Sequence, residues 1–362
     1  MSREMKEFKT EKCSLLPMGS GLNGENLHFS INTKEALDKV ILFEHGTRKV
    51  AGYARVQEEE HFGDLYAFRV LNAAHYDYAL MAGEKYIRDE YAKAVNHYRL
   101  EDGTELETYS TYVDDFDWQD DERIFHPFED SVMYRLHVKG FTKHHSSGVQ
   151  NRGCYAGIVE KIPYLRELGV TTVELMPAYE FDEQIMSGRA RGTKNYWGYG
   201  TANYFAPKAG FSRYGKGSQI NEFKEMVREL HKNQIEVIME FHFVEGTSPH
   251  TIMDALRFWV LEYHIDGIHA NFNVAPLNMI KSDPIISMVK IISNYDTGEN
   301  MENYGHFRDK RRYAIMNDTY IVQERRFIKS DDDQVSGMME QLRRNPHSHA
   351  IINYISNHNT MS

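Results

Sequence analysis

Between residues 131 and 356 the sequence alternates short, nearly continuous apolar runs with longer amphipathic stretches. The apolar runs predict strands at 131–138, 170–177, 236–243, 265–272, 289–293 and 349–356. The amphipathic stretches predict helices at 153–169, 219–233, 251–264 and 333–344. Strands that are apolar on both faces and alternate with helices are typical of a parallel sheet covered on both sides.

The number of strand–helix units favours a closed barrel over an open, doubly wound sheet. At least six units follow one another, and no glycine-rich phosphate turn follows the first strand. We therefore predict a (β/α)8 barrel of the TIM type. Six or seven strands are recognisable and an eighth is not evident, so we expect either an incomplete barrel or a sequence that stops before its last strand.

The N-terminal third has a different pattern. Segments 26–31, 39–44 and 65–71 place apolar or aromatic side chains at alternate positions, between turns that contain glycine. This pattern predicts an immunoglobulin-like β-sandwich. An acidic stretch at 112–127 then reads as a linker. The expected division is a carbohydrate-binding-module-like sandwich at 12–110, a linker at 111–130 and the barrel at 131–362.

Composition limits the classes of partner. The formal net charge of the chain is −11, whereas nucleic acids and anionic membranes select basic surfaces. The sequence has no run of roughly 18 apolar residues, and its first residues lack the apolar core of a signal peptide. We expect a cytoplasmic protein with no nucleic-acid or membrane partner. No cofactor motif is visible, and the adjacent His144 and His145 lack a metal-binding cluster, so we expect no cofactor and no metal.

In such a barrel, the functional groups lie at the carboxyl ends of the strands. Acidic residues lie in the last part of several predicted strands or just after them: Glu174, Glu180, Asp182, Glu183, Glu240, Glu245 and Asp296. No two of them form an obvious catalytic pair. The sequence therefore predicts a polar barrel mouth without naming its chemistry.

Three long stretches, at 131–149, 153–183 and 195–207, resemble the pullulanase and isoamylase branch of glycoside hydrolase family 13, the α-amylase family. Debranching members of this branch cut α-1,6 bonds in glycogen and amylopectin. Segment 86–95 resembles the end of the carbohydrate-binding module family 48 sandwich that precedes such barrels. The resemblance implies the same sandwich-and-barrel architecture.

The resemblance also indicates where catalytic acids would lie, and this chain departs from the pattern at each place. Asn271 stands at the nucleophile position, with His269 in place of the family's arginine. The general-acid position falls on Ser293 or Asn294.

The remaining family positions differ as well. Asn359 replaces the third acid, next to a retained His358. After the third strand, Glu240 replaces an aspartate, and Val244 with Glu245 replaces an Asn-His pair.

A retaining glycosidase needs two carboxyl groups about 5–5.5 Å apart, one ionised and one protonated. An amide is a very poor nucleophile, so we predict a catalytically inactive homologue of a debranching hydrolase. It would bind α-glucan (glycogen, amylopectin or maltooligosaccharide) or regulate an active debranching paralogue. One alternative is an active hydrolase with relocated acids, drawn from Glu240, Glu245 and Asp296. Another is a decayed gene product with no ligand.

Some features of a sugar site remain in the sequence. Tyr196, Trp197 and Tyr199 supply aromatic rings, and the resemblance places Tyr199 under a bound sugar. With His269 and His358 they form the predicted sugar-binding set. The same rings could equally pack the long loop against the barrel.

Overall fold

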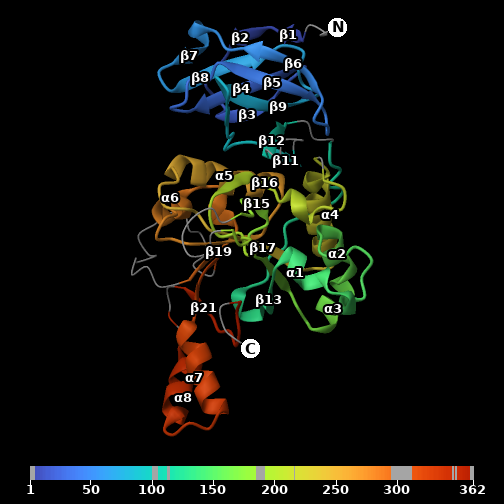
Figure 1. Ribbon diagram of the computed structural model, residues 1–362. Coiled ribbons are helices and arrows are strands. Elements are labelled where there is room, and N and C mark those ends of the chain that lie inside the picture. Colours follow the sequence, from blue (N-terminus) through green and yellow to red (C-terminus); the bar gives the residue numbers. More distant parts are fainter. Residues whose placement is uncertain are drawn as a thin grey trace.

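The computed structural model describes residues 5–99, 105–111, 115–184, 192–215, 217–294, 312–344, 346 and 349–358. The strands between residues 6 and 110 form two sheets, drawn in blue and teal in Figure 1. One sheet has the order β1 (Lys6–Phe8), β6 (Val50–Arg55), β5 (Lys39–Glu44), β9 (Tyr76–Ala82), β12 (Glu105–Ser110) and β11 (Ala94–Arg99), with β10 (Lys85–Ile87) beside β9. The other has the order β2 (Thr10–Lys12), β8 (Leu65–Val70), β4 (Asn26–Asn32) and β3 (Gly19–Asn23), with β7 (His61–Phe62) beside β8.

A single apolar core lies between these sheets, because alternate side chains of both point inward. Phe29 and Phe68 of the second sheet stack at 5.1 Å, and Phe29 meets Tyr78 of the first sheet edge-to-face at 4.9 Å. The segment is thus a two-sheet sandwich. Its immunoglobulin-like character, its likeness to a carbohydrate-binding module and the limits 12–110, 111–130 and 131–362 remain predictions.

The second half of the chain forms a curled sheet of seven parallel strands. Their order follows the sequence: β13 (Met133–Leu136), β14 (Thr172–Leu175), β17 (Glu236–Phe241), β18 (Gly267–Ala270), β19 (Lys290–Ser293), β20 (Tyr313–Met316) and β21 (Ala350–Ile352). In the described part of the chain β13 and β21 do not pair, so the sheet stays open. The predicted parallel barrel is confirmed as an incomplete one.

Helices and short 3-10 turns lie between the strands of both halves of the chain. The α-helices are α1 (Val138–Lys143), α2 (Tyr155–Glu160), α3 (Ile162–Glu167), α4 (Ser218–Lys232), α5 (Pro249–Glu262), α6 (Leu277–Ser282), α7 (Asp318–Ile328) and α8 (Gln334–Arg343). The 3-10 turns are η1 (Glu58–Glu60), η2 (Phe128–Asp130), η3 (His145–Ser147), η4 (Ala209–Phe211) and η5 (Ile286–Met288). Among the described residues, no helix is long and apolar enough to cross a membrane.

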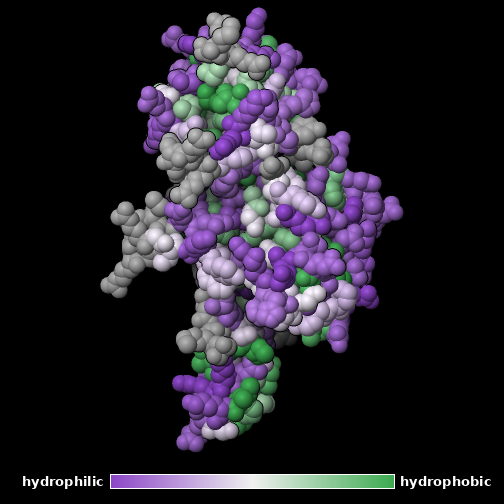
Figure 2. All heavy atoms as spheres, turned by 45° about the vertical axis from the view of Figure 1, so that its right-hand side comes forward, coloured by the Kyte–Doolittle hydropathy of each residue, from purple (hydrophilic) through white to green (hydrophobic). Residues whose placement is uncertain are grey.

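Two features differ from the sequence expectation. The single helix predicted at 153–169 is two helices that meet at Lys161, because Pro163 lies in the first turn of α3 and a proline disrupts the interior of a continuous helix. The helix predicted at 333–344 is α8, but the sequence did not predict α7, which pairs with it. The α7–α8 pair projects away from the sheet in Figure 1. Figure 2 shows apolar side chains on the surface of this projection, where Ile328 and Val335 are exposed.

A hairpin that the sequence did not predict joins the sandwich to the barrel. It consists of β15 (Tyr179–Phe181) and β16 (Ala202–Pro207). Phe205 of β16 stacks on Tyr91 of the sandwich at 4.5 Å, and the Asn203 amide donates to the Asp89 carbonyl at 2.9 Å. Arg88 of the sandwich pairs with Asp182. These contacts fix the hairpin. They also fix the ends of the loop between β15 and β16, which carries Tyr196, Trp197 and Tyr199 and is called the aromatic loop below.

The segment predicted as a linker packs along the barrel. Trp118 stacks on His264 at 3.8 Å. The buried Asp121 carboxylate lies 2.8 Å from His231 Nδ1 and 2.7 Å from His264 Nδ1. His231 Nε2 in turn contacts Asp266, just before β18, at 2.9 Å. The segment is therefore tied to the sheet by a buried set of charges.

Candidate functional site

A partly buried cation, whose side chain is 18% exposed, lies at the barrel mouth. Arg135 of β13 extends between two carboxylates, Glu174 of β14 and Glu240 of β17. Its guanidinium donates a hydrogen bond to Glu240, and its Nε lies 3.5 Å from Glu174 Oε1. Both carboxylates are nearly inaccessible to solvent. A buried charge needs a partner, so both acids share the Arg135 guanidinium, which balances one of their two negative charges.

Arg135, Glu174 and Glu240 form a charged group, and His269 of β18 extends it. Its Nδ1 lies 2.6 Å from Glu174 Oε1 and its Nε2 lies 2.8 Å from Asn294 Oδ1. Because both partners are acceptors, both ring nitrogens act as donors, which is the hydrogen-bonding pattern of imidazolium. Burial opposes the charged ring, but the Glu174 carboxylate raises the pKa of His269 above its usual value. His269 thus supplies a positive charge where the family resemblance expects arginine.

The same contacts determine the state of Glu174. Burial favours its neutral form, but the positive charges of His269 and Arg135 hold the pKa of this carboxyl below its usual range. A general acid of a glycosidase needs a raised pKa. Glu174 is therefore placed to balance charge and not to donate a proton.

Tyr199 connects the charged group to the aromatic loop. Its hydroxyl lies 3.0 and 3.2 Å from the two oxygens of Glu240 and 3.1 Å from His358 Nε2. Burial and the Glu240 charge raise the pKa of Tyr199, so the phenol remains neutral. Burial and the Arg135 charge lower the pKa of His358. Because the single Tyr199 proton is donated to Glu240, a neutral His358 ring that carries its proton on Nε2 can donate it to the Tyr199 oxygen.

The aromatic rings of the loop line the outer part of the mouth. The ring centres of Trp197 and His358 lie 5.2 Å apart, and Tyr196 stacks on His137 with ring centres 4.4 Å apart. Tyr196 and Trp197 are 44% and 38% exposed, which leaves ring surface open to a ligand. The structure thus places Tyr196, Trp197, Tyr199 and His358 together at the mouth. The buried His269 lies beneath them and offers no surface to a sugar.

Asn271 has a defined structural role at the end of β18. Its Oδ1 accepts from the Phe243 N–H at 2.9 Å, and its Nδ2 donates to the Phe243 carbonyl at 2.9 Å. Tyr204 holds the same loop, because its hydroxyl donates to the His242 carbonyl and accepts from the Val244 N–H, each at 3.1 Å. The Asn271 amide is therefore committed to fixing the loop after β17.

The other predicted positions fall in different places. Ser293 is fully buried in β19, whereas Asn294 is exposed at its end. Glu245 lies exposed in the loop after β17. Asp296 and Asn359 lie outside the described residues. Within the described ranges, no group of three or more His, Cys, Asp and Glu side chains could hold a metal ion.

Arg135, which contacts both Glu174 and Glu240, was not predicted as a site residue from the sequence. A signal was present, because an arginine in the middle of the apolar run 131–138 needs a buried partner or a polar cavity. Glu174 was noticed only as one acidic residue among several. Its pairing with His269 required knowledge of the strand order, which places Glu174 and His269 two strands apart on the same sheet.

The sheet is an open parallel barrel, and charged side chains lie at the carboxyl ends of its strands, beneath partly exposed aromatic rings. These features define a barrel protein whose functional site lies at the carboxyl face of the sheet. Comparison with known proteins refines that class. Residues 112–251 match the family model described as "Alpha amylase, catalytic domain". The chain thus carries an α-amylase-type domain segment, and its relatives include isoamylases and GlgX-type proteins, which confirms the predicted kinship.

Two curated relatives show the extent of the similarity. "Isoamylase 1, chloroplastic" of Oryza sativa subsp. japonica is 32% identical over 322 residues, covering 66% of this chain and 39% of that protein. "Glycogen operon protein GlgX homolog" of Mycobacterium tuberculosis (strain CDC 1551 / Oshkosh) is 34% identical over 260 residues, covering 53% of this chain and 35% of that protein. The chain therefore spans well under half the length of either relative.

Solved structures show the same fold. Pullulanase complexed with maltotetraose, from Anoxybacillus sp. LM18-11, superposes with a TM-score of 0.72 at 20% identity. The superposition covers 94% of this chain and 60% of that one. GBS pullulanase SAP in complex with maltotetraose superposes with a TM-score of 0.71 at 17% identity, covering 94% of this chain and 56% of that one.

Proposed function

We propose that this chain binds α-glucan at its barrel mouth and does not hydrolyse it. One observation carries the proposal: the residue at the position assigned to the nucleophile, Asn271, uses both polar atoms of its amide to hold the Phe243 backbone. An amide carries no negative charge to stabilise an oxocarbenium-like transition state. The position thus serves loop geometry instead of bond cleavage.

The remaining carboxylates at the mouth support the same proposal. Glu174 and Glu240 both contact Arg135, and Glu240 also accepts from Tyr199. A carboxylate that already pairs with a buried cation is a poor proton donor. Hydrolysis by relocated acids drawn from Glu240, Glu245 and Asp296 is the alternative. Among the described residues, Glu240 already pairs with Arg135 and Glu245 is exposed.

Binding is supported by the rings that line the mouth. Trp197 and Tyr196 present partly exposed faces beside the hydrogen-bonding tip of His358. Such rings suit the apolar faces of glucose, and a polar neighbour suits its hydroxyls. Relatives of the same fold are complexed with maltotetraose. A role as the regulatory subunit of an active debranching paralogue is compatible with binding without cleavage, and forms part of the proposal.

Equilibrium binding of maltotetraose and glycogen to purified protein tests the proposal. Trp197→Ala should weaken binding roughly 2- to 10-fold, the usual contribution of one aromatic face. Tyr164→Ala is the matched control, because Tyr164 is 40% exposed but lies on α3 outside the sheet. Saturable binding by the folded protein that Trp197→Ala weakens and Tyr164→Ala leaves unchanged supports a glucan site. No binding at millimolar ligand overturns it.

A further inference from the structure

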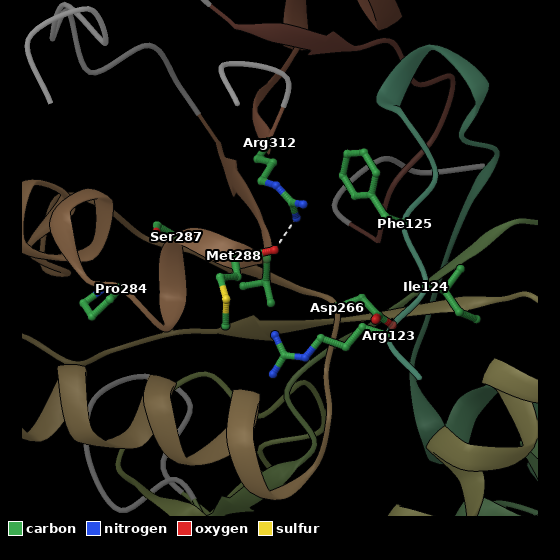
Figure 3. Close-up of a pocket in the computed structure, with 9 residues that line it drawn as sticks. Arg123, Ile124, Phe125, Asp266, Pro284, Ser287, Met288 and Arg312 are labelled. Atoms are coloured by element: carbon green, nitrogen blue, oxygen red, sulfur yellow. Dashed lines mark hydrogen bonds between the residues drawn. The ribbon is translucent and has the colours of Figure 1, made fainter. Parts of the chain in front are cut away.

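Two features lie apart from the aromatic loop. One is a cavity of about 560 Å³ at the amino ends of β18, β19 and β20 (Figure 3). Charged side chains in its wall already have partners within the chain, because Arg312 donates to the Met288 carbonyl and Asp266 contacts His231 at 2.9 Å. The other feature is the surface of the α7–α8 pair, where apolar side chains face solvent (Figure 2). An exposed apolar surface of this kind indicates contact with another molecule.

Helix α8 turns one face toward α7 and the opposite face toward solvent. Gly337 lies against α7, since a Cβ atom at this position would be 2.7 Å from Gln323 Oε1. Gln341, four residues further along, is buried on the same face. With about 3.6 residues per turn, positions 335, 339 and 342 lie roughly 140–160° around the helix axis from Gly337. These positions hold Val335, Met339 and Leu342, of which the first and last are 65% and 58% exposed. They form an apolar stripe on the side of α8 away from α7.

The two ends of α8 carry opposite charges. The exposed residues concerned are Asp332 and Asp333 just before the helix, Arg343 in its last turn and Arg344 just after it. Asp331 also precedes the helix, but it lies 3.6 Å from Lys329, which offsets its charge. A second α8 that ran antiparallel to the first would place its basic end beside the acidic end of the first, so the copies would attract each other at both ends. Parallel pairing would instead bring like charges together.

We propose that α8 pairs with the α8 of a second copy of this chain, antiparallel and around a two-fold axis. The axis would pass near Met338 and Met339, so that Val335 of each copy packs against Leu342 of the other. The two helix pairs would then form a four-helix bundle that buries both apolar stripes. The α7–α8 pair projects away from the sheet in Figure 1, which leaves this face accessible to a second copy. The contact uses no residue of the aromatic loop and is independent of glucan binding.

Analytical ultracentrifugation of the full chain tests this pairing. Salt at about 150 mM screens the repulsion between two copies of net charge −11. Two helices of 10 residues bury less than the roughly 1,200 Å² of a standard interface, so we expect a reversible dimer with a dissociation constant on the order of 10–100 μM. Leu342→Glu should weaken the association at least about tenfold, because it would bury a charge in the apolar stripe. Leu261→Glu, at an exposed leucine of α5, is the matched control and should leave the association unchanged.

Charge reversals test the antiparallel direction. Asp332→Arg and Arg343→Asp should each weaken the association by about 3- to 10-fold, since a like-charged pair would replace an attractive one at each end. An equimolar mixture of these two variants should associate more tightly than either variant alone. In the mixed dimer the two introduced charges attract each other at one end, and the native charges attract each other at the other end. A chain that carries both substitutions should associate as the wild type does.

Thermal unfolding verifies that each variant is folded before its association is measured. A folded wild-type chain that stays monomeric at about 300 μM would overturn the proposal. Association that Leu342→Glu leaves unchanged would place the contact on another surface and overturn it equally. A mixture of the charge variants that associates no more tightly than either one alone would contradict the antiparallel pairing.

Discussion

The Asn271 side chain is hydrogen-bonded to both polar groups of the Phe243 backbone, accepting from its N–H and donating to its carbonyl, each at 2.9 Å. A carboxylate can make only the first of these bonds. Asn271→Asp should therefore fail to create a hydrolase, and it should lower the free energy of unfolding by about 1–3 kcal/mol, because two oxygens would face each other. Urea unfolding at neutral pH measures the loss.

The same substitution has a pH signature. Once protonated, the carboxyl group introduced by Asn271→Asp could again donate to the Phe243 carbonyl, so the loss of stability should shrink as the pH falls toward about 4. Asn278→Asp, on the exposed side of α6, is the matched control and should cost little at either pH. Wild-type stability of Asn271→Asp at neutral pH would show that the contact with Phe243 does not hold the loop.

Removal of the central cation should be severe. In Arg135→Met, Glu174 and Glu240 would be left buried near each other without the shared guanidinium, which should cost about 3–5 kcal/mol. Adding Glu240→Gln should restore part of that stability, because one of the unpaired charges is removed. A double-mutant cycle in chemical unfolding gives the coupling energy. Strictly additive losses would contradict the shared ion cluster.

His231, which is buried and contacts the predicted linker segment, should make the stability of the protein fall at alkaline pH. Asp121 and Asp266 bind the two nitrogens of His231 and raise its pKa to about 9, above the usual value, although burial opposes this. A raised folded-state pKa means that the stabilisation is complete below the unfolded pKa of about 6.5 and is lost as pH rises through about 9.

Thermal unfolding of wild type and His231→Asn between about pH 6 and pH 10 measures this contribution. The wild type should be the more stable protein at the acidic end, and the difference should narrow toward the alkaline end. His75→Asn removes a solvent-exposed histidine and serves as the control. A constant difference across this range would mean that His231 does not carry a proton in the folded state.

A substitution at Tyr199 distinguishes the contribution of its ring to ligand binding from the contribution of its hydroxyl group to stability. Tyr199→Phe keeps the ring and removes the hydroxyl that joins Glu240 to His358. We expect a stability loss of about 0.5–1.5 kcal/mol with little change in maltotetraose affinity. Calorimetry and unfolding on the same sample test this. A large loss of affinity would instead assign the hydroxyl to ligand binding.

Much of the fold could be predicted because its signals are local. The apolar run 236–243 and the helix pattern 251–264 correspond to β17 and α5 within a few residues. The β15–β16 hairpin was not predicted, because a long polar loop separates its two strands in the sequence and no short turn signal joins them. The predicted linker is bound to the barrel by Trp118 and Asp121, contacts that sequence spacing does not reveal.

The site was harder to predict for a related reason. The strand-end residues were identified, but their partners depend on register: Glu240 lies opposite His269 across β17 and β18, and His269 then reaches back to Glu174. The sequence predicted Asn271 as an empty catalytic position. The structure adds what this residue does instead, which only its contacts with Phe243 could show.

The most direct test of the central claim is release of reducing ends from amylopectin and pullulan by verified folded protein over many hours. We predict no release above that of an Asn271→Ala control, which excludes a trace host amylase. Release by the wild type that survives in Asn271→Ala and disappears in Glu240→Gln would contradict the account. It would assign hydrolysis to a relocated acid.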